Sequence, residues 1–209
     1  MNNQKMDRAD PIWKGRKIWV WAAVCAAILP LIFLGDEPIH SLLIEQRVQP
    51  VFQLMAILTW LGQGWLLAAV AIVLFGIGQW RKRPRLRQAA ALSLIALLVS
   101  GLAVQIVKHL AGRPRPRLVD QGVFSWGPSF QSGHDSFPSG HAISAFTMAA
   151  VLSSFYPTGR WIWYSLALLV AFTRVYIGAH FASDVLVGAV LGVWIGIWAS
   201  TLKRGVLKS

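Results

Sequence analysis

Cysteine and charged residues are scarce in this sequence. The single cysteine, Cys25, cannot form a disulfide within the chain, so cysteine gives no indication of the compartment. Only 13% of the residues are charged, against roughly 25% in soluble domains. Five runs contain no Asp, Glu, Lys or Arg: residues 18–35, 48–80, 88–107, 136–159 and 185–202. Because a bilayer span takes about 20 mainly apolar residues, we expect an integral membrane protein, with residues 1–209 as a single domain.

Acidic residues are also few, because 8 Asp and Glu stand against 20 Lys and Arg, which gives a net charge of +12. A chain this basic could in principle bind nucleic acid. Membrane proteins, however, concentrate Lys and Arg in their cytoplasmic loops, and no soluble basic patch here is interleaved with aromatic residues. We therefore expect the bilayer as a partner and no nucleic acid.

The uncharged runs predict an all-α, polytopic membrane protein in which six transmembrane helices form one bundle. The expected helices cover about residues 18–35, 52–79, 88–109, 140–156, 161–177 and 180–202. The first is expected to be retained, because no good signal-peptidase site ends its apolar core. Between the first two helices, the spacing of Ile39, Leu42 and Leu43 indicates a short helix at the membrane interface.

Basic clusters set the expected orientation. Lys and Arg gather before residue 18, in the loop 81–87 and after residue 202, and all three segments lie on one side of a six-helix bundle. The positive-inside rule puts that side, with both termini, in the cytoplasm. In a cell's inner membrane, the loop 110–137 would then face the periplasm or the exterior, and an active site beside it would face outward.

Glycines in two of the expected helices predict close helix packing rather than ligand binding. Gly188, Gly192 and Gly196 recur every four residues, so they form a row of small residues on one helix face. The other set lies in the second expected helix: Gly62, Gly64, Gly76 and Gly78.

Several basic residues lie on the expected outer side, against the positive-inside rule, and their presence needs an explanation. Lys108 and Arg174 lie at the ends of membrane helices, where desolvating a charge is costly. The stretch Pro138–His141 opens a helix, since Pro138 cannot extend one backward and Ser139 is a good N-cap. A helix N-terminus offers unpaired N–H groups and partial positive charge. A multiply charged anion such as phosphate would explain these features together.

His180 and Asp184 are four residues apart and so share one face of a helix. An Asp behind a His fixes the tautomer of the ring and raises its nucleophilicity. The simpler alternative is an ion pair at a helix end, and the pair alone does not decide between the two.

Three motifs give the chain a family resemblance. Residues 108–116 read K-x6-R-P, residues 138–141 read P-S-G-H, and residues 174–184 read R-x5-H-x3-D. In this order they resemble the type 2 phosphatidic acid phosphatase superfamily of membrane lipid phosphatases, with the core motifs spanning residues 108–184. One departure is Thr173, where the family has Ser before the motif arginine. The substitution keeps a hydroxyl.

The resemblance implies a role for each motif residue. His180 would attack phosphorus and form a phosphohistidine, Asp184 would orient and activate it, and His141 would protonate the leaving oxygen and later activate water. The phosphate oxygens would be held by Lys108, Arg115, Ser139, Gly140 and Arg174. Because three cations and a helix N-terminus would stabilise the transferring phosphoryl group, we expect neither a metal nor a cofactor.

Spacing from Lys108 selects Arg115 as the arginine of the first motif, although Arg113 also precedes a proline. Arg113 is instead expected at the substrate entrance, together with Arg117 and His134.

The function expected from the resemblance is that of a lipid phosphate phosphatase, acting on a monoester or a diphosphate at the outer face of the membrane. Candidate substrates are undecaprenyl pyrophosphate, phosphatidylglycerol phosphate and phosphatidic acid, and lipid A phosphatase or phosphotransferase activity is an alternative. The related vanadate-dependent haloperoxidases are soluble, unlike this chain. A non-catalytic lipid-phosphate binder or transporter would need the cations but not His180, His141 and Asp184.

Overall fold

The computed structural model describes residue 30 and residues 32–124 and 126–202, and within these ranges the chain is helical with no strand. Of the expected helix at 18–35, only residues 30 and 32–35 are described, and the basic tail after residue 202 lies outside the described residues. The helices are α2 (Asp36–Glu45), α3 (Gln49–Leu58), α4 (Gly64–Trp80), α5 (Pro84–Ala111), α6 (Pro116–Val119), α7 (Gly140–Phe155), α8 (Arg160–Tyr176) and α9 (Ala182–Thr201). Two 3-10 turns, η1 (Thr59–Gly62) and η2 (Pro157–Gly159), precede α4 and α8. The all-α prediction is confirmed for these residues, as is a short helix before the second expected span.

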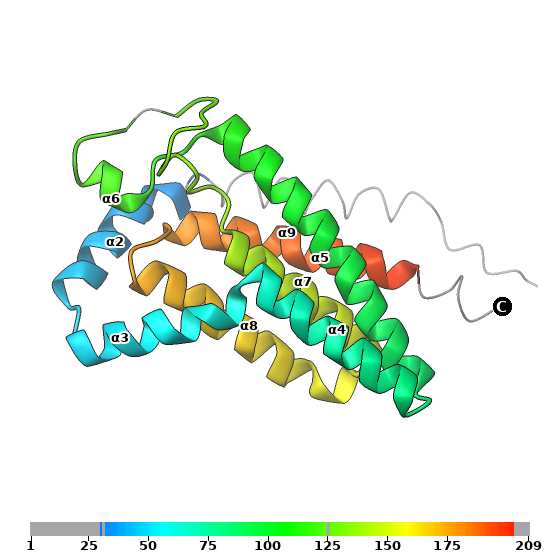
Figure 1. Cartoon of the computed structure of the whole chain (residues 1–209). Coiled ribbons are helices and arrows are strands. Elements are labelled where there is room, and N and C mark those ends of the chain that lie inside the picture. Colours follow the sequence, from blue (N-terminus) through cyan, green and yellow to red (C-terminus); the bar gives the residue numbers. More distant parts are fainter. Residues whose placement is uncertain (1–29, 31, 125, 203–209) are drawn as a thin grey trace, which may run out of the picture.

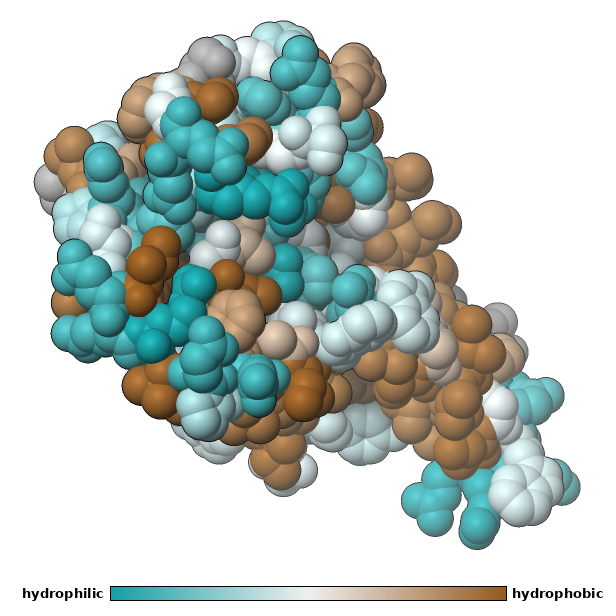
Figure 2. Space-filling model, turned by 60° about the vertical axis from the view of Figure 1, so that its left-hand side comes forward, coloured by the Kyte–Doolittle hydropathy of each residue, from teal (hydrophilic) through white to brown (hydrophobic). Residues whose placement is uncertain are grey.

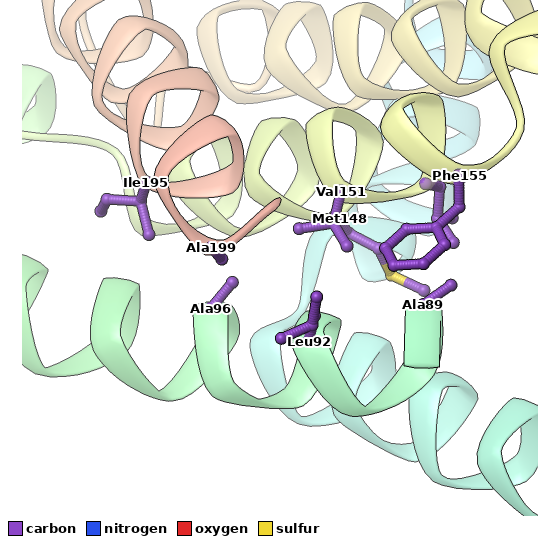
Figure 3. Packing of buried hydrophobic residues seen from close by; sticks show 9 residues of the cluster. Ala89, Leu92, Ala96, Met148, Val151, Phe155, Ile195 and Ala199 are labelled. Carbon is purple, nitrogen blue, oxygen red and sulfur yellow. The ribbon is translucent and has the colours of Figure 1, made fainter. Parts of the chain in front are cut away.

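The centre of the fold is α7, which is packed among α4, α5, α8 and α9 (Figure 1). This helix is apolar on every side, which is typical of a buried helix. One of its faces meets α5 and α9, where Met148 and Val151 pack with Ala96 and Ile195 (Figure 3). Another face packs on α8 around Ala167 and on α9 around Val185. The N-terminus of α7 is therefore held by helices on several sides.

Close contact between α7 and α9 depends on the glycine row of α9, as the sequence predicted. Gly188, Gly192 and Gly196 are all buried. A Cβ atom would lie 2.8 Å from the Ser139 carbonyl oxygen at Gly188, 2.5 Å from the Ile143 carbonyl oxygen at Gly192, and 2.6 Å from main chain of α7 at Gly196. Only glycine permits this approach of the two backbones.

The second expected helix, over residues 52–79, is wrong as a single element. It is broken by η1 into α3 and α4, whose axes differ by 53°. The physical reason lies at Gly62, where a Cβ atom would be 2.3 Å from the Val170 side chain and 3.2 Å from the His141 Cβ. The break lets the main chain approach both residues.

Within the described residues, two helical segments are long and apolar enough to cross a membrane, one including α5 and the other formed by α9. The bent pair of α3 and α4 makes a third if it counts as one span. Helices α7 and α8 have 16 and 17 residues, fewer than the roughly 20 residues that a bilayer span takes. Figure 2 shows hydrophilic side chains gathered over the end of the molecule that carries α2 and α6, with hydrophobic side chains along the helices that extend from it.

Candidate active site

The loop after α5 folds back on itself and so joins two of the sequence motifs. Helix α5 ends at Gly112, whose φ of +51° and close approach to the Gly127 carbonyl exclude a side chain. Beyond it, the Arg115 N–H donates to the Gly133 carbonyl over 2.8 Å, and the Ser136 N–H donates to the Arg113 carbonyl over 3.0 Å. Residues 113–115 and 133–136 therefore lie side by side, which brings the basic motif next to the start of α7.

The N-terminus of α7 presents polar atoms that are buried but unpaired. Ser139 is the N-cap residue, as predicted, and its N–H donates to the Asp184 carbonyl over 3.0 Å. Its hydroxyl does not cap the helix, however. Within the described part of the chain, buried atoms without a hydrogen-bond partner include Ser139 Oγ, His141 Nε2 and Arg174 Nε. Buried polar atoms are normally paired, so these three are suited to a polar ligand.

His180 lies just before α9 and is 2% exposed. Its Nδ1 is 2.7 Å from the Ser136 carbonyl oxygen. A carbonyl can only accept, so Nδ1 carries the proton and Nε2 keeps its lone pair. Burial lowers the pKa of His180 to about 4, although the nearby Asp184 carboxylate opposes the shift. The ring is therefore neutral near pH 7.

Asp184 is fully buried and is held by residues other than His180. Its Oδ2 accepts a hydrogen bond from Ser136 Oγ over 2.6 Å and from the Phe181 N–H over 3.0 Å, and its Oδ1 accepts from Arg113 Nη1 over 2.6 Å. The distance from His180 Nδ1 to Asp184 Oδ2 is 3.6 Å, too long for a hydrogen bond. The two side chains lie close together, as predicted, and Ser136 bridges them. The expected shared helix face is wrong, because His180 precedes the first residue of α9.

The three cations that the motifs predict for phosphate binding differ in the side chains with which they pair. Arg115 makes a bidentate pair with Asp135, with distances of 2.8 and 2.7 Å, and Lys108 Nζ lies 3.4 Å from the same carboxylate. Burial acts to raise the pKa of Asp135, but the hydrogen bond from Arg115 and the charge of Lys108 outweigh it and hold the pKa below its usual range. Arg174 Nη1 donates instead to Thr59 Oγ1 over 2.8 Å.

Arg113 does not lie at an entrance, which corrects the expectation from the sequence. It is 6% exposed, and its guanidinium joins Asp184 to Asp36 of α2, with Nη2 2.7 Å from Asp36 Oδ2. Three aromatic rings surround the guanidinium: Phe33, Trp126 and Phe181. Arg117 is exposed beside Gly133 and His134 is half-buried, so their place at the entrance stays a prediction.

Sequence reasoning missed three residues of this arrangement, Asp36, Thr59 and Ser136. It placed Asp135 only at the entrance beside His134, and not as the partner of Arg115. Ser136 and Asp135 lie two and three residues before Pro138 of the P-S-G-H motif, so proximity to the motif was an available signal. The hydroxyl of Thr173, which replaces the family's Ser, donates to the Val170 carbonyl within α8 over 2.6 Å. Within the described residues, no three His, Cys, Asp or Glu side chains cluster in a way that could hold a metal ion.

An apolar groove of about 630 Å³ begins one helical turn below His141. It follows α7 from Ala145 to Tyr156 and is closed on its sides by α4 and α8, with Leu74 and Leu166 among the lining residues. At 1.5 Å per residue, this part of α7 is about 16 Å long. That length is close to one leaflet of hydrocarbon, which is about 15 Å.

Comparison with known proteins gives a consistent picture. The family model described as PAP2 superfamily matches residues 89–206. Lipid A 1-phosphatase of Rhizobium johnstonii is 31% identical over 82% of this chain and 74% of its own length. Undecaprenyl-diphosphatase of Sulfolobus acidocaldarius is 30% identical over 53% of each chain.

Two solved structures also resemble this fold. The crystal structure of Aquifex aeolicus LpxE matches with a TM-score of 0.56 and 25% identity, covering 78% of this chain and 93% of that one. The transmembrane PAP2-type phosphatidylglycerolphosphate phosphatase of Bacillus subtilis matches with a TM-score of 0.62 and 21% identity, covering 93% and 98%. The second likeness concerns the fold alone.

Proposed function

This chain belongs to the PAP2 superfamily and is a membrane lipid phosphatase, and on that premise we propose that it dephosphorylates its lipid through a phosphohistidine on His180, without a metal. The observation that supports this most directly is the set of buried, unpaired atoms Ser139 Oγ, His141 Nε2 and Arg174 Nε beside a neutral histidine. A phosphate group would satisfy the hydroxyl and the guanidinium, and a leaving oxygen would satisfy His141.

The proposed reaction has two steps. In the first, the lone pair of His180 Nε2 attacks phosphorus, the bond from phosphorus to the lipid oxygen breaks, and His141 gives its proton to that oxygen. In the second, His141 takes a proton from water, whose oxygen attacks phosphorus, and the bond to Nε2 breaks. Inorganic phosphate leaves and His180 returns to its neutral state. Lys108, Arg115 and Arg174 stabilise the charge on the transferring group.

We propose a glycolipid phosphate of the lipid A type as the substrate. The lipid A 1-phosphatases of two Rhizobium species align over 82% of this chain, whereas the undecaprenyl-diphosphatase of Sulfolobus acidocaldarius aligns over 53%. The groove beside His141 is also about as long as one leaflet, which suits an acyl chain. Undecaprenyl diphosphate is the second candidate. The loop 112–139 would face the periplasm or exterior of an inner membrane, since the basic loop 81–87 would be cytoplasmic.

The test uses detergent-purified protein with lipid A, undecaprenyl diphosphate, phosphatidylglycerol phosphate and phosphatidic acid, measuring released phosphate. We expect the highest kcat/KM with lipid A, and an acid-labile, base-stable phosphoryl label on the protein. Both are lost in His180→Ala and kept in His109→Ala, a histidine at the end of α5 that bonds its own helix. A label that persists in His180→Ala would contradict the nucleophile. A higher kcat/KM for undecaprenyl diphosphate would favour the second candidate.

The groove is tested with a matched pair of substitutions on α8. Leu166 lines the groove, whereas Leu168 is 60% exposed and does not line it. Leu166→Trp is expected to raise KM for long-chain lipid phosphates and to leave hydrolysis of a short-chain, water-soluble phosphate ester unchanged. Leu168→Trp should change neither. Equal effects of the two substitutions, or an effect on the short ester, would show that the lipid chain lies elsewhere.

A further inference from the structure

Asp36 lies outside the region matched by the family model, which begins at residue 89, and yet it reaches the catalytic centre. It is the first residue of α2 and is 4% exposed. We infer that Asp36 is a positioning residue, which holds Asp184 and His180 in place through Arg113 and Ser183. The inference rests on the proposed function only in its use of His180 as the nucleophile.

The first link runs through Arg113. One nitrogen of its guanidinium, Nη1, donates to Asp184 Oδ1 over 2.6 Å and to Ser183 Oγ over 2.7 Å. The other, Nη2, donates to Asp36 Oδ2 over 2.7 Å. The planar guanidinium is thus fixed at both ends by carboxylates, a geometry that arginine favours. Without Asp36, one end of a buried cation would lose its partner, and the orientation that serves Asp184 would no longer be fixed.

The second link runs through the start of α9. The first N–H groups of a helix have no acceptor within the helix, and the Ser183 N–H is one of these. It donates to Asp36 Oδ1 over 2.8 Å, while the Ser183 hydroxyl donates to Asp36 Oδ2. Asp36 therefore caps α9 from a distant segment, where a negative charge is also favoured by the helix dipole. His180 lies two residues before α9 begins, so the cap sets the position of the nucleophile.

Anchoring of α2 alone does not explain these contacts, because α2 has other attachments near its middle and end. His40 Nε2 lies 3.3 Å from Asp120 Oδ2, and Arg47 Nη2 donates to the Tyr176 carbonyl over 3.3 Å. Asp36, in contrast, directs both of its oxygens to Arg113 and Ser183, which contact Asp184 or adjoin it in the chain.

The test compares Asp36→Asn, Asp36→Glu and Glu37→Gln. The control, Glu37, is the neighbouring acid in the first turn of α2 and is exposed. Asparagine has the same shape as Asp36 but lacks the charge that pairs with Arg113. We expect Asp36→Asn to lower kcat by about 10- to 100-fold, as the loss of outer partners of site residues typically does, with KM unchanged because Asp36 does not contact the substrate. Asp36→Glu should recover part of the loss, and Glu37→Gln should match the wild type.

A double-mutant cycle separates positioning from a purely structural role. If Asp36 acts in part through Asp184, then Asp36→Asn lowers kcat by a smaller factor in an Asp184→Asn background than in the wild type. Losses that multiply, or a lower melting temperature with the kcat of the folded protein unchanged, would overturn the inference.

A second measurement needs no substrate and keeps the inference separate from the proposed function. The ring nitrogen resonances of His180, observed by NMR in micelles, should move in Asp36→Asn and stay in place in Glu37→Gln. Unmoved resonances would overturn the positioning role even if the enzyme proved active. Moved resonances in a protein without phosphatase activity would uphold it, and only the proposed function would fail.

Discussion

The contact between α7 and α9 predicts that substitutions of two glycines in one row of α9 differ in their effect on catalysis. Gly196→Ala and Gly188→Ala each place a methyl group against α7. At Gly196 the new Cβ would lie 2.6 Å from both Ala150 Cβ and the Thr147 carbonyl oxygen. At Gly188 it would lie 2.8 Å from the Ser139 carbonyl oxygen. Both distances are shorter than van der Waals contact, so the two helices must separate.

The expected change in the free energy of unfolding follows from two opposing effects. Overpacking a well-packed interior costs about 1–3 kcal/mol, whereas replacing glycine by alanine within a helix gains up to about 1 kcal/mol. The net loss at Gly196 and Gly188 is therefore on the order of 1–2 kcal/mol. Gly101 of α5 is the matched control, because within the described structure no heavy atom lies within 4 Å of its added Cβ. Gly101→Ala should stabilise the protein slightly.

Gly188→Ala and Gly196→Ala are expected to differ in their effect on kcat. The atom that Gly188→Ala displaces belongs to Ser139, a proposed phosphate-binding residue, so kcat should fall together with stability. Gly196 lies two turns deeper in α9, so the folded fraction of Gly196→Ala should keep its kcat. The assay is unfolding in mixed micelles followed by tryptophan fluorescence, with phosphate release measured on the same samples.

Two results would refute this reasoning. If Gly196→Ala unfolded no more easily than Gly101→Ala, the two backbones could not be as close as the structure has them. If Gly188→Ala lost stability but kept its full kcat, the Ser139 main chain would not be part of the site.

Three further predictions concern the polar groups of the site. Because burial lowers the pKa of His180 to about 4, its Nε2 should remain unprotonated at pH 6 by NMR, and protonation at that pH would contradict the proposed environment. Burial acts to raise the pKa of Asp135, but the hydrogen bond from Arg115 and the charge of Lys108 outweigh burial and hold the pKa below its ordinary value of 3.8. Its pairing therefore adds stability that is present above about pH 4 and is lost at lower pH, so melting temperature should fall less in Asp135→Asn than in the wild type as pH drops from 5 to 3. Thr59→Val leaves Arg174 Nη1 unpaired, which should cost about 1–3 kcal/mol of stability and raise KM, and Thr59→Ser should restore both; an unchanged KM would separate Thr59 from phosphate binding.

Much of the helical structure could be predicted because uncharged runs and short basic loops mark helices directly. The expected helix at 161–177 corresponds to Arg160–Tyr176, and the one at 140–156 to Gly140–Phe155. The break at Gly62 could not be predicted, because glycine is common in membrane helices and the cause lies in Val170 and His141, more than 75 residues away. Tertiary contacts, rather than the local sequence, determine where this helix breaks.

The motifs identified the residues that surround the proposed phosphate site but not the partners that hold them. Spacing separated Arg115 from Arg113, and the structure gives them different surroundings. The spacing of the motifs could not identify Asp36. In the sequence it is only an acidic residue at the start of the connection between the first two expected helices. The role of a buried carboxylate depends on the cation with which it pairs. The pairing of Asp36 with Arg113 exists only in the folded chain.

The charges of the site explain why two arginines so close in sequence are kept apart in function. Lys108 and Arg115 pair with one carboxylate, Asp135, and Arg174 donates to the neutral hydroxyl of Thr59. The three cations and the one carboxylate leave two net positive charges, which match a phosphate dianion.

Arg113 sits instead between two carboxylates, Asp36 and Asp184, and this buried group carries one net negative charge behind His180. In the proposed reaction, the bond from Nε2 of His180 to phosphorus gives the ring a positive charge that Nδ1 shares. Negative charge on that side stabilises the phosphorylated ring more than the neutral one, as catalysis requires. Exchanging the surroundings of the two arginines would weaken both effects, because the phosphate would face two carboxylates and the ring would lose its net negative neighbours.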